Sequence, residues 1–268
     1  MLDTMEKTAK REWIVFENRG QEIFGVFHRP LKVKNEMPIV VIHHGFASSK
    51  QGSNRCYVLL ADALASKGVA ALRFDFRGSG DSEGYIADLT FDDLVSDAIC
   101  VHEEIKKIGG IDFERLGLFG ASLGGSLAIL ATEVHQMTKA LVLWAPVASG
   151  QLWYYDFVKR AEKSGVDPEK ALASYRGVQL NQVFREQFGQ MQAAQVLSEH
   201  PEIPFLHMHG NDDTMISILH QEAFRKACKH HATAQFKTYP ECEHSLGFAP
   251  IFPSVMQETI DWFEKHLR

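Results

Sequence analysis

Short apolar runs alternate with helical patterns along almost the whole chain, and this alternation limits the possible folds more than any other feature. The central runs contain few polar residues, which is typical of strands buried on both faces of a parallel sheet. We expect these strands at residues 39–42, 69–74, 115–119, 140–144, 204–208 and 234–239. Strands that alternate with helices predict an α/β fold, with a mostly parallel central sheet and helices on both of its faces.

The two ends of the chain extend this pattern. Residues 13–16 and 23–27 flank an Asn-Arg-Gly turn and predict an antiparallel hairpin at the start of the sheet. Helices are predicted at 57–66, between a Thr90-x-x-Asp93 capping box and a Gly-Gly pair at 109–110, and from Ser254 onward. With 268 residues, of which 45% are hydrophobic, the chain can form the core of one large domain, which we expect over residues 1–268.

One segment departs from the alternation. Residues 147–201 are helical in pattern and rich in aromatic residues, and they contain no predicted strand. We expect this segment to be a cap insertion that lies over the strand ends. Its large apolar side chains are Trp153, Tyr154, Tyr155, Phe157, Tyr175, Phe184, Phe188 and Met191. Most of them are expected to pack against the body of the domain, and one or two to line a substrate pocket.

The sequence Gly-Ala-Ser-Leu-Gly-Gly at residues 120–125 lies between the apolar run at 115–119 and a helical pattern. A serine in this context, with glycine two residues before and after it, fits the nucleophile elbow of hydrolases. The turn is so sharp that the serine adopts a strained backbone conformation, and a Cβ atom at Gly120 or Gly124 would strike a neighbouring element. Ser122 is therefore the candidate nucleophile.

A serine nucleophile needs a general base and a carboxylate that orients the base, and in this topology the carboxylate precedes the histidine in the chain. Asp212 and Asp213 follow the run at 204–208, and His244 follows the run at 234–239. Ligands of parallel sheets bind beyond the carboxyl ends of the strands, and all of these residues fall at such an end. We therefore expect them to converge with Ser122.

Four blocks of sequence together resemble one known superfamily. They are His43-His44-Gly45-Phe46, Asp75-Phe76-Arg77-Gly78-Ser79-Gly80-Asp81-Ser82, the serine elbow and the two late loops around Asp213 and His244. In these blocks the chain resembles the capped serine carboxylesterases and serine aminopeptidase-like enzymes of the α/β-hydrolase superfamily, including cinnamoyl and feruloyl esterases. The resemblance covers essentially the whole chain.

The resemblance implies roles for several residues. Asp213 is implied as the acid, because Gly210, Asp213 and Ile216 match a G-x-x-D-x-x-V pattern, with Asp212 as the neighbouring alternative. The oxyanion hole is implied to combine the backbone amides of Leu123 and Phe46. The resemblance also implies that the Asp75-x-Arg77-Gly78 motif braces the loops beneath the site.

One position departs from the pattern of these relatives. Glu-Cys-Glu precedes His244 at residues 241–243, where the relatives usually carry a turn like Gly-Ala-Gly.

Composition excludes several other classes of function. The net charge of -6 and the absence of a basic stripe argue against a nucleic-acid partner. Neither a secretory signal nor a membrane span is expected, and Cys56, Cys100, Cys228 and Cys242 are expected to be reduced thiols of a cytoplasmic protein. The histidines, including the His207-x-His209 pair, do not suggest a metal site. The predicted chemistry needs neither a cofactor nor a metal.

We therefore expect a serine hydrolase that cleaves a small-molecule carboxylic ester through Ser122, His244 and Asp213. An aminopeptidase, acylpeptide hydrolase or thioesterase on the same scaffold is the alternative, and a peptidase would need a cap carboxylate such as Glu162 or Glu169 to bind a substrate amine. A third hypothesis is a small-molecule receptor without catalytic activity. The sequence leaves the acyl group, the alcohol and a homo-oligomeric state open.

Overall fold

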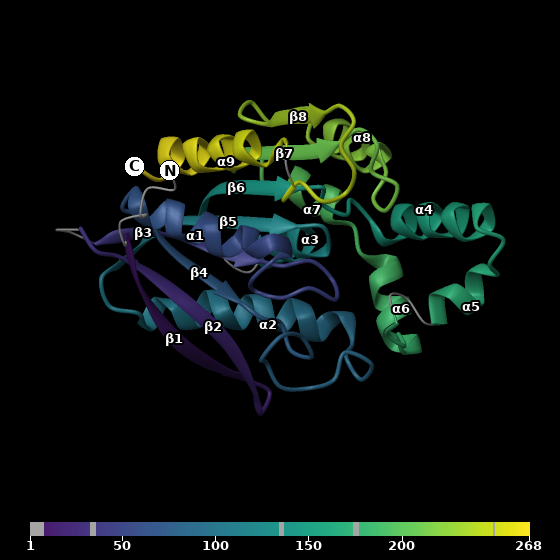
Figure 1. Cartoon of the computed structure of the whole chain (residues 1–268), viewed down its shortest axis with the longest axis horizontal. Coiled ribbons are helices and arrows are strands. Elements are labelled where there is room, and N and C mark those ends of the chain that lie inside the picture. The colour runs from purple at the N-terminus through teal and green to yellow at the C-terminus, as the bar shows by residue number, and fades with distance from the viewer. Residues whose placement is uncertain (1–7, 33–35, 134–136, 174–176, 249) are drawn as a thin grey trace.

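The structure, a computed structural model, describes residues 8–32, 36–133, 137–173, 177–248 and 250–268. Its centre is an eight-stranded sheet in the order β1-β2-β4-β3-β5-β6-β7-β8 (Figure 1). The strands are β1 (Ala9–Asn18), β2 (Gln21–Pro30), β3 (Met37–His43), β4 (Ala70–Phe74), β5 (Ile111–Ala121), β6 (Thr138–Trp144), β7 (Phe205–Gly210) and β8 (Gln235–Tyr239). Only β1 with β2 and β2 with β4 pair antiparallel, and the other neighbours pair parallel, which confirms the predicted α/β sheet.

Helices cover both faces of the sheet. On one face lie α1 (Cys56–Ser66) and α9 (Phe252–Leu267), whose apolar side chains share one buried cluster with the strands. On the other face lie α2 (Phe91–Glu104), α3 (Leu123–Thr132) and α8 (Ile218–Ala227), which form a second cluster. Burial on both sides explains why the central strands are apolar at consecutive positions rather than at alternate ones.

Local signals set most of the element boundaries. The Thr90 side chain accepts a hydrogen bond from the Asp93 amide, and the Asp93 carboxylate accepts one from the Thr90 amide, so the predicted capping box is present. Helix α2 ends at Glu104 and continues only as a short 3₁₀ turn, Ile105–Lys107. Helix α9 begins at Phe252 rather than Ser254, because Pro253 occupies the first turn, where its missing amide is harmless.

The segment 147–201 contains α4 (Gly150–Lys163), α5 (Pro168–Ala173), α6 (Gln182–Gln190) and α7 (Ala193–Ser198). Figure 1 shows α4, α5 and α6 beyond the carboxyl ends of the central strands, while α7 lies near the sheet. The expected aromatic residue Tyr175 lies outside the described residues. Among the helices that the structure describes, none combines the length and the apolar character that a bilayer span requires.

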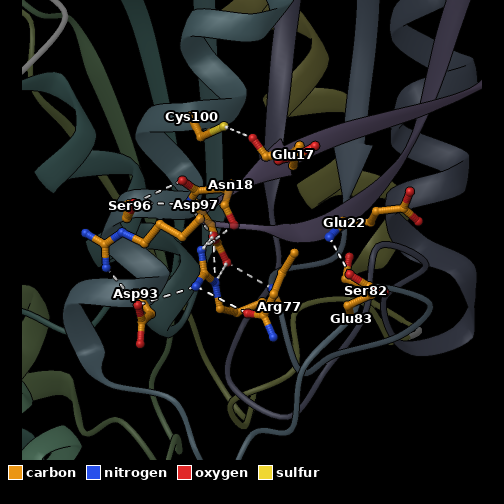
Figure 2. A network of polar contacts seen from close by, with 12 residues as sticks. Glu17, Asn18, Glu22, Arg77, Ser82, Glu83, Asp93, Ser96, Asp97 and Cys100 are labelled. Atoms are coloured by element: carbon orange, nitrogen blue, oxygen red, sulfur yellow. Dashed lines mark hydrogen bonds and ion pairs between the residues drawn. The ribbon is translucent and has the colours of Figure 1, made fainter.

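Charged side chains from the Asp75-x-Arg77 motif tie the loop after β4 to its surroundings. Arg77 donates from Nη2 to Asp97 Oδ1 of α2 at 2.6 Å, and Asn18 of β1 donates to the same oxygen at 2.8 Å (Figure 2). Asp75 is fully buried and binds the buried ammonium group of Lys50. These contacts join β1, α2 and the loop beneath the strand ends, which agrees with the bracing role that the resemblance implies for the motif.

Candidate active site

Ser122 stands at the turn between β5 and α3 in a backbone conformation that few residues adopt. Its φ of 54° and ψ of −126° lie in a region that L-amino acids rarely occupy. The strain is held by backbone hydrogen bonds, since the Ser122 amide donates to the Trp144 carbonyl at 2.8 Å and its carbonyl accepts from the Gly125 amide at 3.0 Å. The turn therefore has the geometry that the glycine-flanked serine predicts.

The glycines two residues either side of Ser122 are required by the close approach of the neighbouring backbone. A Cβ atom on Gly120 would lie 2.5 Å from the Gly124 carbonyl oxygen. A Cβ atom on Gly124 would lie 2.3 Å from the carbonyl oxygen of His43 at the end of β3. Backbone atoms cannot rotate away as side chains can, so any larger residue here forces the strand and the helix apart.

We expect Gly124→Ala to lower the free energy of unfolding by about 3 kcal/mol, because the added methyl group overlaps backbone atoms of β3. Gly109→Ala is the matched control, since a Cβ atom there meets nothing within 4 Å. Urea unfolding monitored by circular dichroism measures both variants. Equal stabilities of the two variants would contradict the close packing of the elbow.

Asp213 and His244 are brought together by the loops that follow β7 and β8. His244 Nδ1 lies 2.7 Å from Asp213 Oδ2, and the Asp213 side chain is completely buried while that of His244 remains partly exposed. The other carboxylate oxygen, Oδ1, accepts hydrogen bonds from the amides of Met215 and Ile216, each at 2.8 Å. The neighbouring carboxylate of Asp212 is exposed to solvent. The structure thus pairs His244 with Asp213 and leaves Asp212 outside the site.

A buried histidine, His209, lies beneath Asp213. Its Nε2 donates to the Ile216 carbonyl at 2.8 Å and lies 3.5 Å from Asp213 Oδ2. His207 lies 3.1 Å from the other ring nitrogen of His209, and burial lowers the pKa of both imidazoles. The two rings are therefore neutral hydrogen-bonding groups that support the loop between β7 and α8, residues 211–217, which we call the acid loop. The His207-x-His209 pattern has this structural use in the fold.

The loop after β3 carries Phe46 toward Ser122. A Cβ atom on Gly45 would lie 3.2 Å from Ser122 Cβ, so this loop passes directly beside the serine. His44 fixes the loop, because its Nδ1 donates to the Gly45 carbonyl at 2.8 Å and its Nε2 accepts from the Phe76 amide at 3.1 Å. Within the block of residues 43–46, the His44 side chain thus fixes the shape of the loop.

The preceding histidine, His43 at the end of β3, is also structural. His43 Nδ1 donates to the Phe119 carbonyl at 2.9 Å, and its Nε2 lies 3.0 Å from His102 Nε2 of α2. Burial lowers the pKa of His43 to about 4, so the ring is neutral at physiological pH. The contact between His43 and His102 gave no signal in the sequence, because 59 residues separate the partners.

Two cavities meet at Ser122. The larger, about 600 Å³, is lined by both Ser122 and His244, and by residues of the loops after β3 and β8. The smaller, about 40 Å³, lies on the side of the 147–201 segment and is mostly apolar. Its lining residues are Phe46, Ser122, Leu123, Val147, Trp153, Leu180, Phe184, Phe188, Met215 and Ile216. Ser122 thus lines both a wide chamber and a narrow, mostly apolar one.

Within the described residues, no hydrogen bond joins Ser122 Oγ to the His244 imidazole. Such bonds are often long in unliganded hydrolases and tighten when substrate binds.

The carboxylates that a peptidase would use do not face Ser122 from the insertion. Glu169 accepts a hydrogen bond from the Tyr154 hydroxyl at 3.0 Å and lines a separate cavity within the insertion. Glu162 is exposed on α4. The carboxylate residues that line the cavity shared by Ser122 and His244 are Glu241 and Glu243, from the loop that follows β8.

Comparison with known proteins places the chain in a family. The model of the serine aminopeptidase S33 family matches residues 34–167, which is half of the chain. An uncharacterized 31.7 kDa protein of Escherichia coli is 30% identical over 127 residues, a match that spans 47% of this chain and 43% of that protein. The chain thus covers less than half the length of this relative.

Solved structures share the whole fold. Est1E from Butyrivibrio proteoclasticus, determined with ferulic acid bound, has a TM-score of 0.78 at 21% identity and covers 94% of this chain and 98% of its own. The Pyrococcus furiosus esterase Pf2001 has a TM-score of 0.75 at 17% identity and covers 97% of this chain and 92% of its own. The chain is therefore an α/β-hydrolase that belongs to the serine aminopeptidase S33 family.

Proposed function

We propose that the protein is a serine hydrolase that cleaves carboxylic esters through an acyl-enzyme intermediate. Ser122 Oγ attacks the ester carbonyl carbon while His244 Nε2 accepts its proton. Asp213 holds the imidazole through Nδ1 and stabilises the imidazolium that forms. The imidazolium then protonates the departing alcohol, and a water molecule, activated in the same way, releases the acid from Ser122.

The oxyanion of the tetrahedral intermediate is proposed to bind the backbone amides of Leu123 and Phe46. Leu123 is the first residue of α3, so its amide has no partner within the helix. The positive end of the α3 dipole points to the same place. Donors of this kind contribute roughly 2.7–4 kcal/mol each to transition-state stabilisation in other acyl-transfer enzymes.

One observation carries the proposal: the strained elbow serine and the imidazole paired with Asp213 line one cavity. A structural serine would not need positive φ, and a structural histidine would not need an open chamber beside it. Since binding alone does not require this arrangement, it supports an enzyme rather than a receptor.

The narrow apolar pocket is proposed to hold the acyl group, with residues 147–201 acting as a cap. Trp153, Phe184 and Phe188 give this pocket an aromatic wall. The relative Est1E binds ferulic acid, an aromatic acid, which supports an acyl or aryl group at this place.

We expect Phe188→Ala to shift the substrate preference toward longer acyl chains. Phe188 lines the narrow pocket and also a cavity of about 490 Å³ within the insertion, so removal of its ring joins the two spaces. The ratio of kcat/KM for p-nitrophenyl octanoate to that for the acetate should rise about 10-fold. Val183→Ala, at an exposed position of α6, is the matched control. An unchanged ratio would show that the acyl group binds elsewhere.

Parallel assays of p-nitrophenyl esters and aminoacyl anilides test the class of reaction. We expect turnover of the esters and little cleavage of the anilides, since neither Glu162 nor Glu169 lines the cavities at Ser122. Preference for the anilides would favour the peptidase. Absence of turnover with every acyl substrate would contradict the proposal and favour a receptor.

A further inference from the structure

Arg160 of α4 holds the same peptide groups that bind Asp213. Its Nη1 donates to the carbonyl oxygens of Thr214 at 2.8 Å and Met215 at 3.2 Å. The amides on the other side of these two peptide units, those of Met215 and Ile216, donate to Asp213 Oδ1. Because a peptide unit is planar and stiff, a carbonyl fixed by Arg160 also fixes the direction of the amide opposite it.

Asp156, one turn before Arg160 on the same face of α4, holds the next peptide unit. The Ser217 amide donates to Asp156 Oδ2 at 2.7 Å, and the Ser217 hydroxyl donates to Oδ1 at 2.9 Å. The carbonyl of that unit, at Ile216, accepts from His209. The three consecutive peptide units between Thr214 and Ser217 are therefore hydrogen-bonded at both the carbonyl and the amide. In each of them, one of these two bonds is made by a side chain of α4.

The Asp156 carboxylate is buried and has a second partner in α8. His220 Nδ1 accepts a hydrogen bond from the Ala148 amide at 2.8 Å, which places the ring proton on Nε2, 3.4 Å from Asp156 Oδ2. Burial tends to raise the pKa of Asp156, but the contacts from His220 and Ser217 outweigh it and lower the pKa. The charged carboxylate also lies at the positive end of the α8 dipole.

We propose that Asp156 and Arg160 are positioning residues for the Asp213–His244 pair, so that helix α4 and the acid loop form one rigid unit. The proposal rests on the proposed function, in which Asp213 orients the general base. Without Arg160, two peptide units can rotate and withdraw both amides from Asp213 Oδ1. The other oxygen, Oδ2, then loses its fixed direction toward His244 Nδ1.

The kinetic test replaces Arg160 with methionine, which keeps the apolar stem but cannot donate. We expect kcat for a p-nitrophenyl ester to fall about 10- to 100-fold with KM nearly unchanged, because the loss is one of alignment. Arg160→Lys, which keeps the charge and a hydrogen-bond donor, should give an intermediate kcat, and Asp156→Asn should fall in the same range. Lys163→Met, at an exposed site in the last turn of α4, is the matched control and should leave kcat unchanged.

A double-mutant comparison separates positioning from a general loss of structure. In the Asp213→Asn background, Arg160→Met should lower kcat no further, because Arg160 acts through Asp213. If the loss of kcat in the double variant equals the product of the losses in the two single variants, the positioning role is overturned.

A spectroscopic readout is independent of turnover. A proton shared between His244 Nδ1 and Asp213 at 2.7 Å should give a strongly downfield proton NMR resonance, identified by its absence in His244→Gln. We expect this resonance to broaden or move upfield in Arg160→Met and to persist in Lys163→Met. A resonance unchanged in Arg160→Met would overturn the positioning role. Absence of ester turnover by the parent protein would instead overturn the proposed function, and the resonance would still decide the positioning role.

Discussion

Replacement of Ser122 by alanine is expected to lower ester turnover by roughly 10⁵- to 10⁶-fold, the loss seen when the nucleophile of other serine hydrolases is removed. The alanine keeps the Cβ atom, so the elbow backbone and its hydrogen bonds to Trp144 and Gly125 remain. The loss should appear in kcat rather than in KM, because substrate binding does not need the hydroxyl. Initial rates with a p-nitrophenyl ester measure the loss.

The matched control is Ser126→Ala, on the first turn of the same helix. Ser126 is fully buried and donates to the Val147 carbonyl at 2.7 Å, so its loss should cost about 1 kcal/mol of stability and little activity. If Ser122→Ala retained more than a tenth of the parental kcat, another nucleophile would have to be sought.

Asp213→Asn is the second large effect, with an expected fall in kcat of about 10⁴-fold. The asparagine oxygen can still accept the amides of Met215 and Ile216, so the loop should keep its shape. Its amide group then faces His244 Nδ1 as a donor, and the proton is forced onto Nε2. An imidazole protonated at Nε2 cannot accept the proton of Ser122, so catalysis fails while the fold survives.

Asp212→Asn is the control for this prediction, because the neighbouring side chain carries the same charge but points to solvent. Its kcat should stay within about twofold of the parent. Thermal unfolding of both variants shows whether stability is affected. A larger loss in Asp212→Asn than in Asp213→Asn would reverse the assignment of the acid.

Much of the fold could be predicted because its signals are local. The consecutive apolar residues of β3, β4 and β6 reflect burial on both faces, and the Thr90–Asp93 pair begins α2 as expected. The glycines around Ser122 also report local geometry, since the close approach of backbone atoms leaves no room for other residues.

The candidate site was predictable for a related reason. Parallel strands place their carboxyl ends at one edge, so residues that follow different strands must meet there. Asp213 and His244 follow β7 and β8, and the structure places them 2.7 Å apart. Asp212 could not be excluded from the sequence, because adjacent loop residues differ only in the direction of their side chains.

The parts that could not be predicted depend on pairs distant in sequence. Asp156 and Ser217 are separated by 61 residues, and no pattern in either segment indicates the other. The same holds for the division between an open chamber and a narrow apolar pocket, because residues from several loops line each of them. Such contacts arise from tertiary packing, which local propensity does not encode.

The most direct measurement is the mass of the protein after reaction with a fluorophosphonate probe, followed by mapping of the labelled peptide. A hydroxyl activated by the His244–Asp213 pair should take up one probe per chain, on the peptide that contains residue 122. Labelling should disappear in Ser122→Ala and slow in Asp213→Asn. A parent protein that remains unlabelled, or a label that persists after Ser122→Ala, would contradict the central claim.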